Sequence, residues 1–433
     1  MSTRARWTIR IAGAALAVLG ITVGALWLAG VFQPGPGFAG TAAAHPDTTW
    51  DGLFQAYGNS SGAWSGGDGA QSLALPDGGT VWFFADTFLG TIDPGGTRSP
   101  VTTGLAHNSA VLYRDGRLGP TYAGAPGLGG YNSIADYTWV APPPPYPADR
   151  YELINGDQVI DHGTVYKFYQ LADRHIHPGG FQYKLVGTVI ETFSLGTATS
   201  PGTATSLGTA TGTATGTLTP AGGTPMGIQD SARSNPVIWG AATLVSGGYI
   251  YIYGVKPYNG HTAPFPLYLA RVPVGGLAAG DAWQYYAGGP GCSPPASAWV
   301  SDPRSATALM TGVSAGFSVT DVNGTFVLLT GDNSTAVTAN DAVAYYAGCP
   351  TGFSSGSPRY HVYQPRLSDG YLAYEYRIVP QFSAGSDVLV SYSLNTTVVG
   401  GNFGNILTYR PHFLDVKLPG IGGRSGAVTD PAP

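Results

Sequence analysis

Two aspartates, Asp68 and Asp86, stand near the open ends of one strand-turn-strand pattern. The connection Pro76–Gly78 suits a three-residue turn, with Pro and Asp in a type I turn and Gly in the left-handed position. Such a turn pairs Leu75 with Gly79, and counting outward from this pair sets Asp68 opposite Asp86. Because side chains alternate along a strand, both carboxyl groups then point to one face.

Directly opposed residues have Cβ atoms about 4.5–5.5 Å apart, so two carboxylates placed there repel each other. One carboxyl is expected to keep its proton while the other stays ionised, which is the acid and base division that glycosidic cleavage requires. Which aspartate is the acid stays open. In the alternative, Asp68 caps a turn and Asp86 ends a strand, and a slip of one residue at the turn sends them to opposite faces.

Four further polar residues are candidates for contacts with substrate hydroxyls. Asp157 follows a Gly turn at the start of a second strand unit, as either a third pocket acid or a plain loop residue. His107 and Asn108 lead into a strand, and Asn395 follows one. The alternative for these last three is that they only complete hairpins.

Two tryptophans, Trp64 and Trp239, are candidates for stacking on a sugar ring, because each stands beside a small residue near the expected pocket rim. Most tryptophans of such a domain belong to the core. The sequence contains no Gly-x-Ser-x-Gly elbow, P-loop or dinucleotide fingerprint, which argues against common esterase, kinase and dehydrogenase chemistry. No His, Cys and carboxylate set has the spacing of a transition-metal site, so we expect neither a metal nor a cofactor.

The elements that must position these residues are short strands separated by turns rich in Gly, Asp or Asn. Similar hairpin units recur around Gly67, Asn155, Trp239, Gly316 and Ser386, at intervals of roughly 70 to 90 residues. No convincing amphipathic helix interrupts them. We therefore expect an all-β fold, a five-bladed β-propeller, with a tandem of β-sandwiches as the competitor. The clearest strands are Gln71–Leu75, Val81–Ala85, Thr164–Gln170, Tyr249–Val255, Phe317–Asp321, Thr325–Thr330 and Val388–Leu394.

Composition agrees with this fold class and limits the partners. Only 10% of the 433 residues are charged, and Glu occurs three times, so long helices lack their usual surface residues. A net charge of −5 supplies no basic surface, and Lys and Arg do not cluster beyond the N-terminus. Nucleic acid is therefore excluded as a partner.

The N-terminal segment predicts export. Arg4, Arg6 and Arg10 precede an uncharged, largely apolar run, Ile11–Phe32. As a helix rising about 1.5 Å per residue, this run covers the roughly 30 Å of bilayer hydrocarbon, and the arginines keep its start inside the cell. It is a cleavable signal peptide or, because the small-residue site Ala42–Ala44 lies well beyond it, an uncleaved membrane anchor.

Export also bears on the two cysteines and on the boundaries of the folded part. Cys292 and Cys349 lie in an oxidising compartment and are expected to pair, with two separate buried thiols as the alternative. We expect a signal or anchor at 1–32, a flexible spacer at 33–49, the propeller at 50–420 and a disordered tail at 421–433. The Gly/Thr/Ala-rich composition of residues 196–227 predicts a disordered insertion.

Blocks around the two aspartates form a fairly specific pattern at Gly66–Gly69, Leu75–Gly78, Trp82–Gly90 and His107–Ser109. More generic blocks follow at Leu269–Pro273, Phe317–Thr320, Ser391–Asn395 and Tyr409–Phe413. With these blocks the sequence resembles, over most of residues 50–418, a family of exported bacterial proteins of which some members are classed as endo-D-arabinanases.

The resemblance implies a five-bladed propeller that cleaves α-D-arabinofuranosyl links in the arabinan of mycobacterial-type cell walls. It assigns catalysis to Asp68 and Asp86, and it implies arabinogalactan or lipoarabinomannan as the polysaccharide substrate. Two other functions stay open. One is a non-catalytic carbohydrate-binding propeller on the cell surface, and the other is a cell-wall scaffold whose central acids hold a cation such as calcium.

Overall fold

The computed structural model describes residues 37–126, 136–175, 183–195, 218–226, 236–257, 264–334, 340–398 and 400–422. The apolar run at 11–32, most of the insertion at 196–227 and most of the tail at 421–433 lie outside these residues. Within the described ranges, no helix has both the length and the apolar character needed to span a membrane.

The hairpin that carries Asp68 and Asp86 has the predicted register. Its first arm comprises β3 (Trp64–Gly67) and β4 (Gln71–Ala74), and its second arm comprises β5 (Thr80–Phe84) and β6 (Thr87–Leu89). The Leu75 N–H donates to the Gly79 carbonyl over 2.8 Å, which closes the expected turn. Gln71 then lies opposite Phe83, and the same count continues to Gly67 opposite Thr87.

The strands of the described residues form six sheets, and the chain is all-β apart from short helices. The hairpin contributes to two sheets. One is β4-β5-β8-β9, with β8 at Ser109–Arg114 and β9 at Arg117–Tyr122. The other is β10-β11-β7-β6-β3, with β7 at Gly104–Ala106, β10 at Ala125–Pro126 and β11 at Asp136–Thr138.

Two sheets follow in the middle of the chain. The first is β12-β13-β14-β15, with strands at Tyr151–Asp161, Thr164–Asp173, Lys184–Leu195 and Leu218–Met226. The second is β16-β17-β18-β19-β20, with strands at Ile238–Ser246, Tyr249–Val255, Phe265–Pro273, Gln284–Tyr286 and Trp299–Val300; β21 (Met310–Val313) pairs with β18. Part of the tract expected to be disordered therefore forms a strand, because β15 pairs along β14.

The last two sheets combine both ends of the described chain. In β1-β25-β24-β23-β22 the strands are Gly40–Thr41, Arg359–Tyr363, Ala342–Ala347, Thr325–Gly331 and Phe317–Val322. In β2-β28-β27-β26 they are Ala43–Pro46, Pro411–Lys417, Asp387–Thr396 and Tyr371–Ile378. The short helices are α2 (Gly401–Gly404) and single 3-10 turns at Gly280–Ala282, Ala296–Ala298, Pro303–Ser305 and Pro380–Phe382.

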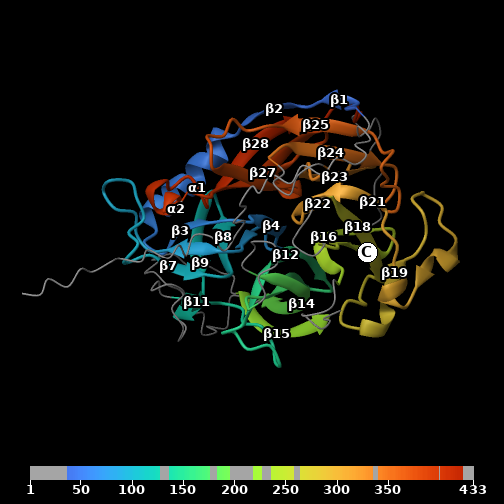
Figure 1. Ribbon diagram of the computed structural model, residues 1–433, viewed down its shortest axis with the longest axis horizontal. Coiled ribbons are helices and arrows are strands. Elements are labelled where there is room, and N and C mark those ends of the chain that lie inside the picture. Colours follow the sequence, from blue (N-terminus) through green and yellow to red (C-terminus); the bar gives the residue numbers. More distant parts are fainter. Residues whose placement is uncertain are drawn as a thin grey trace, which may run out of the picture.

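Five of these sheets are arranged around a centre, as in a propeller (Figure 1). The strands β4, β12, β16, β22 and β26, here called the central strands, all contribute side chains to one cavity of about 240 Å³. Five apolar clusters fill the spaces between neighbouring sheets, and the fifth lies between the last sheet and the first. One residue pair represents each cluster: Val81 with Leu153, Phe168 with Ile252, Leu267 with Val319, Val327 with Val390, and Trp82 with Phe413. The core is thus divided among the faces of neighbouring sheets.

The structure corrects two expectations at the start of the folded part. The segment expected as a flexible spacer contains β1 and β2, and β2 pairs with β28 from Ala43 opposite Lys417 to Pro46 opposite Leu414. A helix, α1 (Thr48–Ser60), follows, although none was expected. Its N-cap is Asp47, and Phe54 stacks on Phe413 at 5.5 Å between ring centroids. This helix forms because its aromatic face covers the sheets beside it, which outweighs its weak local helix propensity.

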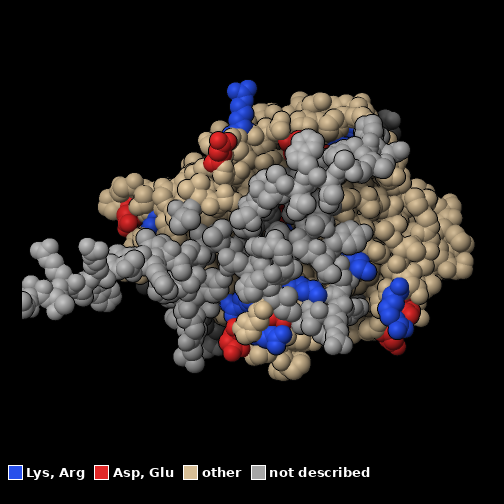
Figure 2. Space-filling view, in the orientation of Figure 1, with Lys and Arg blue, Asp and Glu red and all other residues tan. Residues whose placement is uncertain are grey.

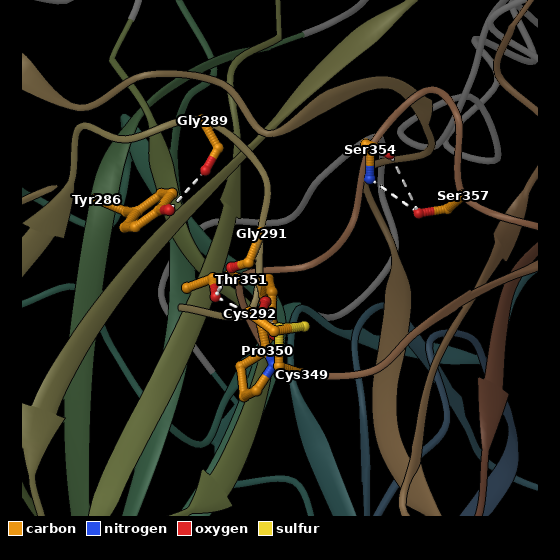
Figure 3. Close-up of a disulfide and its surroundings, with 10 residues drawn as sticks. Tyr286, Gly289, Gly291, Cys292, Cys349, Pro350, Thr351, Ser354 and Ser357 are labelled. Atoms are coloured by element: carbon orange, nitrogen blue, oxygen red, sulfur yellow. Dashed lines mark hydrogen bonds between the residues drawn. A yellow bond between two sulfur atoms is a disulfide. The ribbon is translucent and has the colours of Figure 1, made fainter. Parts of the chain in front are cut away.

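Cys292 and Cys349 are joined by a disulfide, with their Cα atoms 5.4 Å apart (Figure 3). Cys292 lies between β19 and β20, and Cys349 follows β24, so the bond links two neighbouring sheets. Hydrogen bonds beside it hold the same junction: Thr351 Oγ1 donates to the Gly291 carbonyl over 2.6 Å, and the Tyr253 hydroxyl donates to the Pro350 carbonyl over 2.8 Å.

Candidate active site

Asp68 and Asp86 lie opposite each other where the hairpin passes from one sheet to the next. The Asp68 N–H donates to the Asp86 carbonyl over 3.1 Å, and the Ala85 N–H donates to the Asp68 carbonyl over 2.9 Å. The residues are buried, with 2% of Asp68 and 9% of Asp86 exposed. The charge of Asp86 contributes to a raised pKa of Asp68, after the larger effect of burial.

The surroundings of Asp68 favour its protonated form. Burial raises its pKa well above the ordinary value for aspartate, and the charges of Asp86 and Glu375 raise it further. The Tyr374 hydroxyl opposes this shift by donating to Oδ2 over 2.6 Å. The other oxygen, Oδ1, is buried and has no hydrogen-bond partner among the described residues. A neutral carboxyl with its proton available is the state that this environment stabilises.

Asp86 faces a histidine. His107 Nδ1 lies 3.3 Å from Asp86 Oδ1 and 3.4 Å from Glu152 Oε2, so the imidazole stands between two carboxylates. Its other nitrogen, Nε2, lies 3.4 Å from Arg174 Nη1, and Arg174 Nε lies 4.0 Å from the Glu152 carboxylate. Asp86 therefore has a chargeable imidazole as its neighbour, and Arg174 lies behind it against His107 and Glu152.

Sequence reasoning missed Glu152, Arg174, Tyr374 and Glu375. The Tyr183 phenol shows that the acids gather in one place, since its pKa is raised by burial and then by the charges of Glu152, Asp86, Asp68 and Glu375. One signal was available. Glu occurs three times in the chain, and two of these residues, Glu152 and Glu375, belong to this site.

Two of the predicted binding residues have structural contacts instead. Asn108 uses its amide to bond both the N–H and the carbonyl of Val140, each over 2.9 Å, and so anchors the turn that carries His107. Asp157 accepts hydrogen bonds from the Thr243 N–H over 2.6 Å and the Thr243 hydroxyl over 3.0 Å. It lines the central cavity, whose lining among the described residues includes neither Asp68 nor Asp86.

The expected stacking tryptophans belong to the core. Trp64 has 0% of its surface exposed, because Phe54 of α1 and Phe84 cover it, and Trp239 has 2% exposed and packs on Tyr285. Neither ring is available to a sugar. Asn395 is also fully buried, and its side-chain oxygen accepts from the Thr396 N–H and from Asn402.

Charge and metal-binding groups are sparse elsewhere in the described ranges. Charged side chains stand singly or in small groups on the face in Figure 2, and the described residues there form no broad patch of one sign. The described residues contain no group of three or more His, Cys, Asp and Glu side chains arranged to hold a metal ion.

Residues 51–418 match the family described as "Domain of unknown function (DUF5005)". The chain belongs to the DUF5005 family. The DUF5005 domain extends from α1 to beyond β28 and so includes every residue of the site described above. A search among curated proteins found no match.

Solved structures similar to this DUF5005 chain include a candidate hydrolase from Bacteroides ovatus, which is 18% identical over 88% of this chain and 92% of that chain, with a TM-score of 0.60. An alpha-L-arabinanase from Cellvibrio cellulosa is 10% identical over 81% and 91%, with a TM-score of 0.38. A family 117 glycoside hydrolase from Zobellia galactanivorans is 12% identical over 83% and 87%, also at 0.38. At such identities the similarity concerns the fold alone.

Proposed function

We propose that this DUF5005 protein is an exported glycoside hydrolase, a five-bladed propeller that cleaves arabinofuranosyl linkages of cell-wall D-arabinan. The observation that supports it most is the opposition of Asp68 and Asp86 across one hairpin, with Asp68 in surroundings that retain its proton. The five apolar clusters between successive sheets support the number of blades.

In this mechanism Asp68 is the general acid and protonates the glycosidic oxygen as the bond to the leaving sugar breaks. Asp86, whose carboxylate faces His107, acts as the nucleophile or activates water on the other side of the sugar. The assignment of the acid follows from the surroundings of Asp68, because a buried carboxyl beside like charges retains its proton.

The substrate and location rest on sequence features beyond the site. The blocks around Asp68, Asp86 and His107 carry the resemblance to endo-D-arabinanases. The apolar run Ile11–Phe32 and the disulfide support export, because disulfides persist outside the cytoplasm. We therefore propose a membrane-anchored or secreted protein that acts on arabinogalactan or lipoarabinomannan at the cell surface and needs no cofactor.

The test is release of oligosaccharides from purified arabinogalactan and lipoarabinomannan. Asp68→Asn and Asp86→Asn should each lower kcat/KM by about a hundredfold to ten-thousandfold, the range for general acid and base groups. Asp415→Asn, which changes an exposed carboxyl on β28, serves as the folded control with unchanged activity. Full activity in either site variant would exclude the paired-carboxyl mechanism, and glycan binding without turnover by the wild type would favour a binding protein.

The same assay separates the two roles. An acid is needed most when the leaving group is a poor one, so Asp68→Asn should retain more activity on an aryl arabinofuranoside with an acidic phenol than on arabinan. Asp86→Asn should be equally impaired on both substrates. The reverse pattern would exchange the roles of the two aspartates.

A further inference from the structure

Four of the five central strands have a glycine in or just before the strand, at the level of Asp68. The fifth, β26, has Glu375 at this position. Contacts beside these positions join the strands: the Asn155 amide donates to the Gly69 carbonyl over 2.9 Å, and Arg377 Nη1 donates to the carbonyls of Ala241 and Phe317 over 3.2 and 2.6 Å. The five positions are Gly69 before β4, Gly156 in β12, Gly240 in β16, Gly316 before β22 and Glu375 in β26.

Glu375 has a backbone conformation that glycine would adopt without strain. Its φ of 55° is left-handed, and it lies in a bulge of β26 between Tyr374 and Arg377. A side chain other than glycine rarely takes this conformation, and where it does the surrounding structure holds it for a reason. Strand packing does not require a side chain at this position, since the other central strands have glycine at the same level. The left-handed backbone of Glu375 therefore needs another explanation.

The Glu375 side chain occupies the space that two of these glycines leave empty. A Cβ atom on Gly69 would lie 2.6 Å from Glu375 Oε2, and a Cβ atom on Gly316 would lie 2.6 Å from Glu375 Cγ. Gly69 follows Asp68 directly in the chain, so the Glu375 carboxyl lies against the backbone that carries Asp68. Its Oε2 is buried and has no hydrogen-bond partner among the described residues.

Two buried basic side chains, Arg377 and Lys167, act on Glu375 through their charges. Lys167 has no exposed surface, and its Nζ donates to Gln71 Oε1 over 2.7 Å, to Gln158 Oε1 over 3.0 Å and to the Gly156 carbonyl. Three acceptors match the three hydrogens of an ammonium group. Burial lowers the pKa of Lys167 and raises that of Glu375, and their mutual attraction opposes both shifts, as does the attraction between Arg377 and Glu375.

We propose that Glu375 is a positioning residue whose carboxylate, buried against the backbone that carries Asp68, keeps the proton on Asp68 until it is transferred to the leaving group. The inference rests on the proposed function of Asp68 as the acid. Repulsion between two carboxylates in one buried space is the physical cause, because the second charge is avoided by protonating one of the pair. The other ionisable groups that face Asp68 are Asp86, Tyr374, Tyr409 and Tyr183.

The pH dependence of kcat/KM on arabinan tests this role. Removal of the Glu375 charge lowers the pKa of Asp68, so Glu375→Gln should move the alkaline limb of the profile to lower pH. For each unit that the limb moves, the rate on that limb falls about tenfold, while the rate at acidic pH stays close to that of the wild type. Glu191→Gln, the same change at a buried glutamate on β14, should leave the limb in place.

A second variant distinguishes loss of the Glu375 charge from a folding defect. Glu375→Gly restores the residue that the other central strands carry, relieves the left-handed backbone and should fold, as checked by thermal unfolding. It should shift the alkaline limb in the same direction as Glu375→Gln. A uniform loss of rate at every pH in both folded variants would show a merely structural role and overturn the proposal.

A direct titration separates this proposal from the proposed function. With ¹³C-labelled aspartate carboxyls, the Asp68 resonance can be assigned by its loss in Asp68→Asn, and its titration can be followed in wild type and Glu375→Gln. Asp68 should titrate at lower pH in Glu375→Gln even if the protein cleaves no arabinan. An unchanged Asp68 titration would overturn the proposal, whereas inactivity of the wild type on all arabinans would contradict only the proposed function.

Discussion

At the scale of single residues, Asp68 receives opposite influences from two neighbours in one bulge of β26. The Tyr374 hydroxyl donates to its carboxylate and so stabilises the anion, whereas the Glu375 charge destabilises it. Burial raises the pKa of Tyr374 well above its ordinary value, so this phenol stays a donor. The protonation of Asp68 is therefore a balance, and each of the two neighbours shifts it in a known direction.

Tyr374→Phe tests this balance. Without the hydroxyl, the pKa of Asp68 rises further, so the alkaline limb of kcat/KM should move to higher pH, opposite to the effect of Glu375→Gln. The unpaired carboxyl oxygen should also cost about 1–3 kcal/mol of unfolding free energy, measured in urea. Tyr371→Phe on the same strand is the control, since its hydroxyl contacts Asn405 and not Asp68. A shift to lower pH would contradict the assignment.

At the scale of elements, the β16–β20 and β22–β25 sheets are tied together at a junction of loops. The disulfide between Cys292 and Cys349 closes a separation of 57 residues, and Thr351 and Tyr253 add hydrogen bonds beside it. Closing so long a loop restricts the unfolded chain, which is the main source of stabilisation in the chain-entropy account. None of these residues contacts Asp68 or Asp86. The junction therefore stabilises the fold without affecting the positions of the two aspartates.

Replacing both cysteines by alanine should lower the free energy of unfolding by about 4 kcal/mol, in the chain-entropy estimate for a loop of this length. The folded double variant should keep its activity. Guanidinium unfolding with and without reductant measures the effect, and reductant should destabilise the wild type but not the double variant. Equal stability of the two proteins under oxidising conditions would contradict a structural role for the bond.

At the scale of the whole molecule, the ring of sheets is completed by strands from the two ends of the described chain. Strand β2 pairs with β28 as the outer strand of the last sheet, and α1 then leads into the first hairpin. Two buried arginines join the same regions, since Arg98 and Arg410 both donate to the Ser65 carbonyl. The two ends of the described chain therefore meet beside the first hairpin.

Truncation of the chain to begin at Asp47 tests this closure, because it removes β2, together with the two-residue β1, but keeps the N-cap of α1. Loss of the four-residue ladder should lower stability by about 2–4 kcal/mol and leave the edge of β28 open to self-association. Thermal unfolding and light scattering are the measurements. A chain that begins at residue 37 is the control, and equal melting temperatures of the two chains would show that β2 adds nothing to the closure.

Much of the hairpin and several strands could be predicted because they depend on neighbours along the chain. The strand Tyr249–Val255 has the predicted bounds, and the other clear strands differ from prediction by a few residues at their ends. Helix α1 could not be predicted, since its stability comes from packing on Phe413, which lies far along the chain. The burial of Trp64 and Trp239 was missed for the same reason, because the covering residues belong to other elements.

The amino-acid sequence by itself determined the register that sets Asp68 opposite Asp86, because turn chemistry and strand alternation act over neighbouring residues. It also determined the partner of each cysteine once the bond forms, since the chain has only two. Only the tertiary structure decided which groups surround the two aspartates. Glu375 lies more than 300 positions from Asp68 in the sequence, and no local rule relates them; their contact arises because five sheets converge on one centre, where strands remote in the chain become neighbours.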